Sequence, residues 1–466
     1  MVLAEARFPM KHTLRSMLIA LLMFSTFALL PADTVDDYIN IEMKNMRIPG
    51  LSLAVVKNGR LIKSAGYGLS NVETATPATP ATAYKVASLS KPIIATAVML
   101  LVQQGKLRLD DKVARYLSGS PSSWQSITLR HLLTHTSGVP RDPADYHPYQ
   151  EQQPMAVIES AFSMPLLFQP GEKWLYSNIG YYVLAEIISK VTGIPWSDFI
   201  AKQLFEPAGM ASTRLTSVSA IIPNRARGYE ADEAGLLNAE DWIAVRPSGA
   251  YVSTVLDLAK LDAFIDSRGL LEVATRAAMK TPVRLLDDKT AAYGLGWNVD
   301  SYLGKERIFH DGQYPGFRSD WERFENQRLS IILLANLGSA RVERLALKIA
   351  GFYSPDLAAP EFSTSAAPIL APLSIDKQGT ITVVVRSNTR SAPDTVLELE
   401  IWDEANKAVH KQSRTSQNFS AGESRTYEFT WTPTKPGKYT VNLGVYGPRW
   451  TPSYSWNQGM AKITVE

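Results

Sequence analysis

Ser88 and Lys91 stand three residues apart in the stretch V-A-S-L-S-K-P-I-I-A-T-A-V-M-L, and together they suggest nucleophilic catalysis. Residues at i and i+3 share one face of a helix, so the two side chains would be neighbours. A lysine buried beside a serine loses stabilisation of its ammonium, and the resulting amine can take the serine proton or lower the pKa of a nearby phenol. The plainer alternative is a serine that caps a helix and a lysine that faces solvent.

The segment around this pair is predicted to be a helix that begins at Ser88. Apolar residues recur at helical spacing between positions 93 and 101, and Gly105 is placed to end the helix. Pro92 fits only a first turn, because proline lacks the amide donor that an interior turn requires. Ser88 is therefore predicted at a helix amino terminus, where free amides and the helix dipole stabilise an alkoxide or an oxyanion.

Three further stretches carry polar residues that can assist a serine nucleophile. In P-G-E-K-W-L-Y-S-N-I-G-Y-Y, Tyr176 and Asn178 form a Y-x-N element before a predicted helix. In I-F-H-D-G-Q-Y-P-G-F-R-S-D, His310 and Gly312 form H-x-G in a predicted strand. The third stretch is I-T-L-R-H-L-L-T-H-T-S-G-V, residues 127–139. Taken singly, three of these residues have structural alternatives: Tyr176 could be a core tyrosine, Asn178 a helix-capping asparagine and His310 a buried strand histidine.

In this order and at these separations, the stretches resemble the penicillin-recognising serine hydrolases, in particular the class C β-lactamase branch with its carboxylesterase and D-peptidase relatives. The likeness runs from about Tyr38 to Asn336 and includes I-P-G-L-S-L-A-V-V, L-D-D-K-V-A-R-Y-L and G-L-G-W. The resemblance implies that Ser88 is the acylated nucleophile, Lys91 its hydrogen-bonded partner and Tyr176 the general base, as a phenolate favoured by a positive Lys91.

The resemblance also assigns the groups that hold a substrate. Asn178 would bind an amide or ester carbonyl, and the oxyanion hole would consist of the backbone N–H groups of Ser88 and Gln313. His310 and Gly312 stand where penicillin-binding relatives have Lys-Thr-Gly. Because histidine is mostly neutral at pH 7, it is a poorer anchor for the carboxylate of a β-lactam. We therefore expect hydrolysis of an ester, a small amide or a D-peptide, with His310 among the catalytic groups.

Other functions remain open on the sequence alone. One is β-lactamase or penicillin-binding, D,D-peptidase-type activity, and another is a non-catalytic sensor that binds peptidoglycan or peptide in the same cleft. The chain has no G-x-S-x-G elbow, Walker-type loop or dinucleotide glycine loop, so no nucleotide cofactor is implied. His131 and His135 have the spacing of a metal pair, but H-E-x-x-H is missing and the resemblance places them in a structural segment. We predict neither a metal nor another cofactor.

The length of 466 residues predicts more than one domain. Between 33 and 353, helical and strand patterns mix, with a hairpin signal at Asn58-Gly59 and strands near both ends, which predicts one α+β unit closed by both ends of the chain. The resemblance implies the β-lactamase/transpeptidase-like fold, an antiparallel sheet flanked by helices plus an all-helical lobe. A Pro-, Ala- and Ser-rich linker, 354–372, is followed by β-rich runs typical of an Ig-like β-sandwich, 373–466.

The amino terminus has the pattern of a secretory signal peptide, predicted for residues 1–32. Lys11 and Arg15 precede the apolar run M-L-I-A-L-L-M-F-S-T-F-A-L-L, which is followed by P-A-D-T. The run is shorter than the roughly 20 residues of a membrane-spanning helix. We expect cleavage after about Ala32 and export to the periplasm or the medium, with an uncleaved anchor as the alternative. Met10 offers a second possible start for this signal.

Composition and charge limit the classes of binding partner that the sequence implies. Hydrophobic residues make up 45% and charged residues 20%, as in ordinary folded proteins. The 48 basic and 45 acidic residues form no long block, so no nucleic-acid partner is implied. There is no cysteine, which excludes disulfides and thiol catalysis. We expect a monomer that acts on a small-molecule ester, amide or peptide. In the sandwich, Trp450, Tyr454 and Trp456 suggest binding to cell wall or polysaccharide, with core packing as the alternative.

Overall fold

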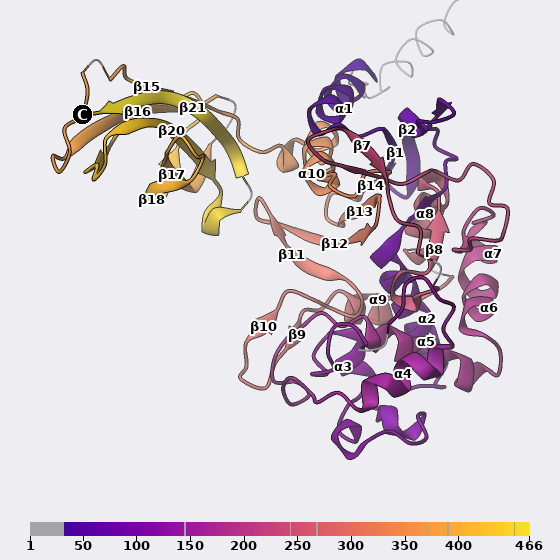
Figure 1. Ribbon diagram of the computed structural model, residues 1–466. Helices are drawn as coiled ribbons and strands as arrows, with labels where there is room; N and C mark the ends of the chain where they lie inside the picture. Colours follow the sequence, from indigo (N-terminus) through magenta and orange to yellow (C-terminus); the bar gives the residue numbers. More distant parts are fainter. Residues whose placement is uncertain are drawn as a thin grey trace, which may run out of the picture.

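The computed structural model describes residues 32–466 except 144–145, 243, 267–268, 370, 389–390 and 452. All but the last residue of the predicted signal peptide, 1–32, lies outside the described residues. No helix in the described part is both long and apolar enough to cross a bilayer. Figure 1 shows a large α+β domain and, to its left, a smaller all-β domain in which the chain ends.

A seven-stranded antiparallel sheet forms the centre of the α+β domain, in the order β11-β12-β13-β14-β1-β2-β3. Its strands are β1 (Gly50–Lys57), β2 (Arg60–Asn71), β3 (Thr76–Pro77), β11 (Asn298–Tyr302), β12 (Lys305–Tyr314), β13 (Phe317–Phe324) and β14 (Leu329–Ala335). The early strand β1 pairs with the late strand β14, which confirms that both ends of this unit close one sheet. Asn58 and Gly59 turn between β1 and β2 with φ of 55° and 70°, as the hairpin signal predicts.

Two cores cover the two faces of this sheet, because successive residues of a strand point to opposite sides. Leu53 of β1 belongs to the core shared with α1 (Ala32–Met46) and α10 (Val342–Tyr353). Its neighbour Ala54 belongs to the larger core, which contains residues of α2 (Ser90–Gln103), α5 (Ile179–Thr192) and α8 (Val255–Ile265). The central strands are therefore apolar on both faces.

The segment between β3 and β11 supplies the helical lobe, which lies below the sheet in Figure 1. Its other helices are α3 (Leu129–Leu133), α4 (Pro154–Phe162), α6 (Trp196–Ile200), α7 (Glu206–Ala208) and α9 (Val273–Met279). Short strands accompany them: β4 (Tyr84–Lys85), β5 (Arg214–Leu215), β6 (Tyr229–Ala231), β7 (Leu236–Asn238), β8 (Tyr251–Ser253), β9 (Val283–Arg284) and β10 (Thr290–Ala291). The predicted α+β fold with a helical lobe is confirmed.

The helix that carries the S-x-x-K pair starts later than predicted. Ser88 lies in a separate 3₁₀ turn, η1 (Ala87–Leu89), and α2 begins two residues after it. The first turn is 3₁₀ rather than α-helical, and Ala87 enters it with a left-handed φ of 49°. The predicted end is confirmed, since α2 stops just before Gly105, which has a φ of 71°.

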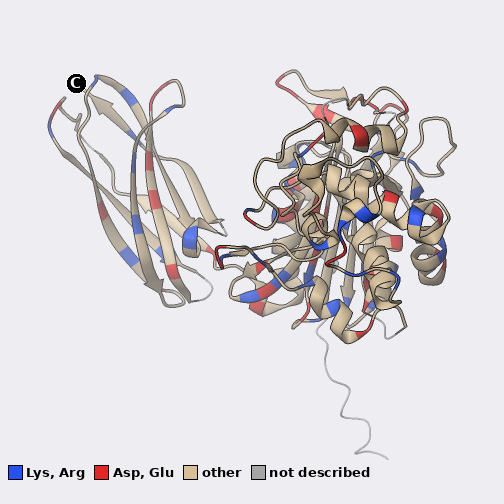
Figure 2. Cartoon of the chain, turned by 90° about the horizontal axis from the view of Figure 1, so that it is seen from below, with Lys and Arg blue, Asp and Glu red and all other residues tan. Residues whose placement is uncertain are grey.

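The carboxyl-terminal domain consists of two antiparallel sheets around one core. One sheet is β15 (Phe362–Ala366), β16 (Gly379–Ser387) and β19 (Ser424–Trp431); the other is β18 (Ala408–Phe419), β17 (Ala392–Trp402), β20 (Gly437–Tyr446) and β21 (Ser453–Val465). Strand β15 lies inside the stretch predicted to be a linker, 354–372. The Pro-, Ala- and Ser-rich composition of this stretch favoured a linker, but Phe362 of β15 is buried in the sandwich core. Figure 2 shows acidic and basic residues interspersed over both domains.

Candidate active site

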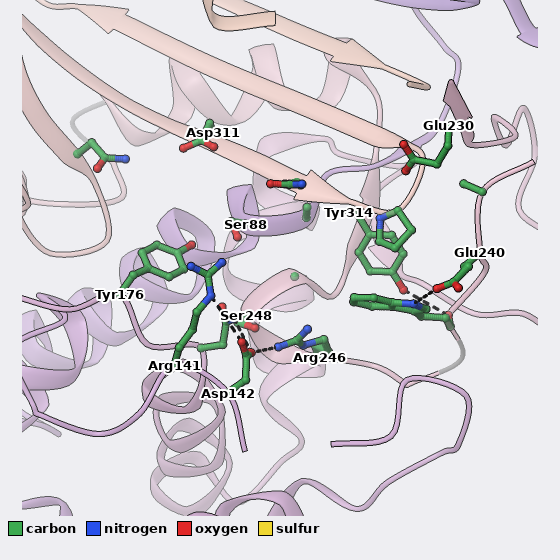
Figure 3. A pocket seen from close by; sticks show the side chains of 18 of the residues that line it. Ser88, Arg141, Asp142, Tyr176, Glu230, Glu240, Arg246, Ser248, Asp311 and Tyr314 are labelled. Atoms are coloured by element: carbon green, nitrogen blue, oxygen red, sulfur yellow. Dashed lines mark hydrogen bonds and ion pairs between the residues drawn. The ribbon is translucent and has the colours of Figure 1, made fainter. Parts of the chain in front are cut away.

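A cavity of about 1060 Å³ opens between strand β12 and the helical lobe. Of the residues singled out from sequence, Ser88, Tyr176, Asn178 and Gln313 line it. In Figure 3, β12 forms the upper wall of this cavity, and the residues near Tyr176 and Asp142 form the opposite, lower side. We call the buried groups around Ser88 the floor, and the cavity-facing residues of β12 the strand wall.

Lys91 is fully buried on the floor, with three oxygen atoms around its amine. Its Nζ lies 3.2 Å from Oγ of Ser88, 2.9 Å from Oδ1 of Asn178 and 3.0 Å from the carbonyl oxygen of Ser248. Burial, and next the positive charge of Arg246, lower the pKa of Lys91 well below its usual value. The carbonyl and amide oxygens can only accept hydrogen bonds. A neutral Lys91 that donates to both therefore turns its lone pair toward the hydroxyl of Ser88.

Tyr176 completes the floor beside the same hydroxyl. Its ring centroid lies 4.6 Å from Nζ of Lys91, and the side chain of Ser88 is near enough to lower its pKa. Burial raises the pKa of Tyr176, and the effect of Ser88 offsets only part of that rise. The resemblance implies a phenolate, but the structure favours a neutral phenol at rest. The same burial that lowers the pKa of Lys91 thus keeps the proton on Tyr176.

Asn178 is fixed by a group of charged residues behind it. Its Nδ2 donates to Oδ1 of Asp142 over 2.7 Å, which directs its oxygen to Lys91. Asp142 also pairs with Arg246, whose guanidinium lies 4.2 Å from the ring centroid of Tyr146, and more loosely with Arg141, at 3.5 Å. Asn178 precedes α5 but its side chain makes no capping hydrogen bond, so the structural alternative does not describe it.

His135 holds the backbone on both sides of Tyr176. Its carbonyl oxygen accepts from the amide of Leu175 at 2.9 Å, and its Nδ1 accepts from the amide of Ser177 at 3.1 Å. Its ring centroid lies 4.3 Å from that of Tyr176. His135 reaches this position with a left-handed φ of 59°. The stretch 127–139 drew attention in the sequence, but its spacing gave no sign of this role.

His310 contributes differently from its prediction as a catalytic group. It is 1% exposed, and among the described residues it is not part of the cavity lining. The carbonyl oxygen of Asp311 can only accept, so Nδ1 of His310 donates to it at 2.7 Å. In the neutral ring, Nε2 of His310 then accepts from the hydroxyl of Tyr293 at 3.1 Å. Burial lowers the pKa of His310 to about 4, so the ring is neutral at pH 7.

Gly312 lets the strand wall approach the nucleophile. A Cβ at this position would lie 2.5 Å from the carbonyl oxygen of Val86 and 2.2 Å from Oγ of Ser319. That hydroxyl donates to the same carbonyl of Val86 at 2.8 Å, which ties the turn carrying Ser88 to β13. The result is that Gln313 and Ser88 line one cavity from two elements.

Comparison with known proteins finds the same family that the sequence motifs resemble. Residues 35–351 match the Beta-lactamase family. The chain is 30% identical over 307 residues to Penicillin-binding protein 4* of Bacillus subtilis (strain 168), which covers 61% of this chain and 67% of that protein. Across the curated relatives compared, the chain spans 64% to 67% of their length.

Two solved structures share the fold. The octameric penicillin-binding protein homologue from Pyrococcus abyssi matches with a TM-score of 0.62 at 21% identity, over 89% of this chain and 98% of that chain. The D-amino acid amidase from Ochrobactrum anthropi SV3, complexed with L-phenylalanine, matches with a TM-score of 0.58 at 26% identity, over 69% of this chain and 95% of that chain.

Proposed function

The chain belongs to the beta-lactamase family, a family of serine hydrolases, and from this premise we propose that it hydrolyses esters or small amides, including D-peptides, through an acyl-enzyme on Ser88. The observation that carries the proposal is the contact of 3.2 Å between Nζ of Lys91 and Oγ of Ser88, made by a buried amine whose pKa is lowered. A neutral amine at that distance is a competent general base for a serine hydroxyl.

The reaction then follows from the positions of these groups. The proton of Ser88 passes to neutral Lys91, directly or through the hydroxyl of Tyr176, while Oγ bonds to the substrate carbonyl carbon. The backbone N–H groups of Ser88 and Gln313 would stabilise the oxyanion that forms. As this intermediate collapses, the bond to the leaving group breaks and the leaving group takes the proton. Water attacks the resulting acyl-enzyme by the same route and releases the acid.

Ester and amide substrates are favoured over β-lactams because the site lacks a cation where Lys-Thr-Gly relatives have one. His310 is neutral and buried, and the residue after it on β12 is the acidic Asp311. The amidase relative at 26% identity supports this choice. The second candidate is penicillin-binding, D,D-peptidase-type or β-lactamase activity, which the 30% identity to Penicillin-binding protein 4* favours. The third is a sensor that is acylated and does not turn over.

A substrate panel separates these functions. The purified protein is incubated with p-nitrophenyl acyl esters, D-amino-acid amides and a chromogenic cephalosporin, beside the variant Ser88→Ala. We expect steady turnover of esters or amides that Ser88→Ala lacks, with weak turnover of the cephalosporin. A burst of product followed by no turnover would favour the sensor function. Preferential hydrolysis of the cephalosporin would favour β-lactamase activity. No turnover and no adduct at Ser88 would contradict the proposal.

We also propose export with removal of a signal peptide, on the pattern of residues 1–32. Amino-terminal sequencing of the exported protein should begin near Asp33; a chain that keeps its apolar run would contradict cleavage.

For the carboxyl-terminal sandwich we propose binding to cell wall or polysaccharide. Trp450 and Trp456 are 39% and 38% exposed, whereas Tyr454 stacks on Phe362 with ring centroids 5.8 Å apart. Exposed indole rings can stack on sugar faces. Retention of the full chain on peptidoglycan, chitin or cellulose would support this role, and retention on none would contradict it.

A further inference from the structure

Asp311 occupies the middle of the H-x-G element and faces the cavity that holds Ser88. It is exposed, and it lies in the cavity lining together with Gln313. The two residues point to the same side of β12 and their Cα atoms are about 6.6 Å apart along the strand. Figure 3 shows Asp311 on the strand above Ser88 and Tyr176. Its carboxylate is thus close to the place where the proposed oxyanion hole would hold a substrate carbonyl.

The carboxylate of Asp311 is not tied to a protein partner. Among the described residues no hydrogen bond or ion pair is made to it, although its charge acts at longer range on Arg318 and Lys91. Arg318, opposite Gln313 in the next strand, donates its Nε to the carbonyl of Gly338 at 2.6 Å, so it forms no ion pair with Asp311; burial lowers its pKa, and the charge of Asp311 offsets part of that effect. Asp320 lies directly across from Asp311, and burial raises its pKa well above the usual value. The Asp320 carboxyl brings no positive charge to this wall in either protonation state.

The cations in the cavity lining are held on the opposite side. Arg141 and Arg246 both pair with Asp142 on the lower side of the cavity in Figure 3. Two other carboxylates, Glu230 and Glu240, lie at the far end from Tyr176 in the same view. They accept hydrogen bonds from the amide of Gly316 and the indole of Trp242, at 2.8 and 3.2 Å. The strand wall near the nucleophile is therefore anionic.

We propose that Asp311 selects substrates that carry an ammonium group near the scissile carbonyl and disfavours those that carry a carboxylate there. This inference rests on the proposed function, because it names the substrate class of the same cavity. The substrate ammonium would form an ion pair with the carboxylate of Asp311 while the carbonyl lies between Ser88 and Gln313. A substrate carboxylate in the same position would meet a like charge that no ion pair neutralises.

Three benzyl esters of D-alanine test this selection on one scaffold. One has a free ammonium, one an N-acetyl group and one an N-succinyl group, which gives charges of +1, 0 and −1 near the same carbonyl. We expect kcat/KM of the wild-type protein to fall in that order. Asp311→Asn should lower the ratio of ammonium to acetyl ester by about tenfold, an effect of one close charge pair. Asp311→Glu should keep the preference, and Glu240→Gln should change it less than twofold.

Binding provides a readout that does not depend on turnover. Calorimetry with Ser88→Ala should show tighter binding of the ammonium ester than of the succinyl ester, and adding Asp311→Asn should remove the difference. An unchanged ratio in Asp311→Asn, in rates and in binding, would overturn the inference while leaving the proposed function intact. Absence of hydrolysis of all three esters would count against the proposed function, and the binding ratios would still decide the role of Asp311.

Discussion

The floor of the cavity and its strand wall are built in opposite ways. On the floor, Lys91 is buried among three oxygen atoms, and Tyr176 is held by His135 on both sides. On the strand wall, Asp311 is exposed and the described residues provide it with no partner. Partnered, buried groups hold one geometry and have shifted pKa values, whereas exposed groups are free to meet a ligand.

This difference separates reaction from selection. Changes on the floor should lower the rate with every substrate, since they alter proton transfer at Ser88. Changes on the strand wall should alter which substrate is preferred, while proton transfer at Ser88 continues. Gly312 is the point where both regions touch, because the turn that carries Ser88 packs against it.

The largest effect is expected from Gly312→Ala, which forces the two regions apart. A Cβ at 312 would lie 2.5 Å from the carbonyl of Val86, so the turn carrying Ser88 must move. Displacement by about 1 Å can cost about 100-fold in rate. We expect that loss in kcat/KM with all substrates. Gly304→Ala is the control: its φ of 74° makes an alanine costly for stability, but no atom lies within 4 Å of the added Cβ, so kcat/KM should be kept. Equal rates for both variants would contradict the contact.

His135 variants sharpen the account of the floor. His135→Phe keeps a ring beside Tyr176 but loses the Nδ1 that accepts from Ser177, whereas His135→Asn keeps an acceptor and tolerates the left-handed backbone. We expect His135→Phe to lower kcat by about tenfold with little change in KM, the effect of one lost buried hydrogen bond. His135→Asn should retain more activity. Equal losses in the two variants, or losses confined to KM, would show that His135 does not position Tyr176.

The pH profile tests the amine of Lys91 as the base. Activity needs the neutral form, so kcat/KM should rise as pH passes the lowered pKa of Lys91. Arg246 lowers this pKa and Asp142 raises it. Arg246→Gln should therefore shift the acidic limb to higher pH and Asp142→Asn to lower pH, each by about one unit. Shifts in the same direction, or no shift, would contradict Lys91 as the titrating group.

The smallest effect is expected from the sandwich. Trp456→Ala and Trp450→Ala should change hydrolysis of a small ester less than twofold, because neither residue is part of the cavity lining in the described part of the chain. Both should weaken retention on whichever polysaccharide the full chain binds. A large loss of ester hydrolysis would show that the sandwich takes part in the reaction.

The sequence predicted the fold and the members of the floor because these signals are local. Hydrophobic periodicity gave the helix of Lys91, the Asn58-Gly59 turn gave the first hairpin, and motif order linked Ser88 with Tyr176. The helix start was wrong by two residues, since apolar periodicity does not distinguish the 3₁₀ turn at Ser88 from the first turn of the α-helix.

The partners that fix the floor are long-range contacts, which spacing along the chain cannot reveal. Ser248 meets Lys91 from 157 residues away, and Ser319 meets Val86 from 233 residues away. The sequence left a catalytic and a buried His310 both open, because strand alternation does not say which face lines a cavity. Asp311 was visible in the sequence, but only the side-chain positions show that it lines the cavity and forms no ion pair with a described residue.

The most direct test of the central claim is the rate at which a fluorophosphonate labels Ser88, followed by intact mass and peptide mapping. The wild-type protein should be labelled once, on Ser88, faster as pH rises from acidic to neutral. Lys91→Met and Tyr176→Phe should each slow that labelling by at least about 100-fold while the fold is retained. Labelling at another residue, or an unchanged rate in Lys91→Met, would contradict a serine nucleophile activated by the buried amine.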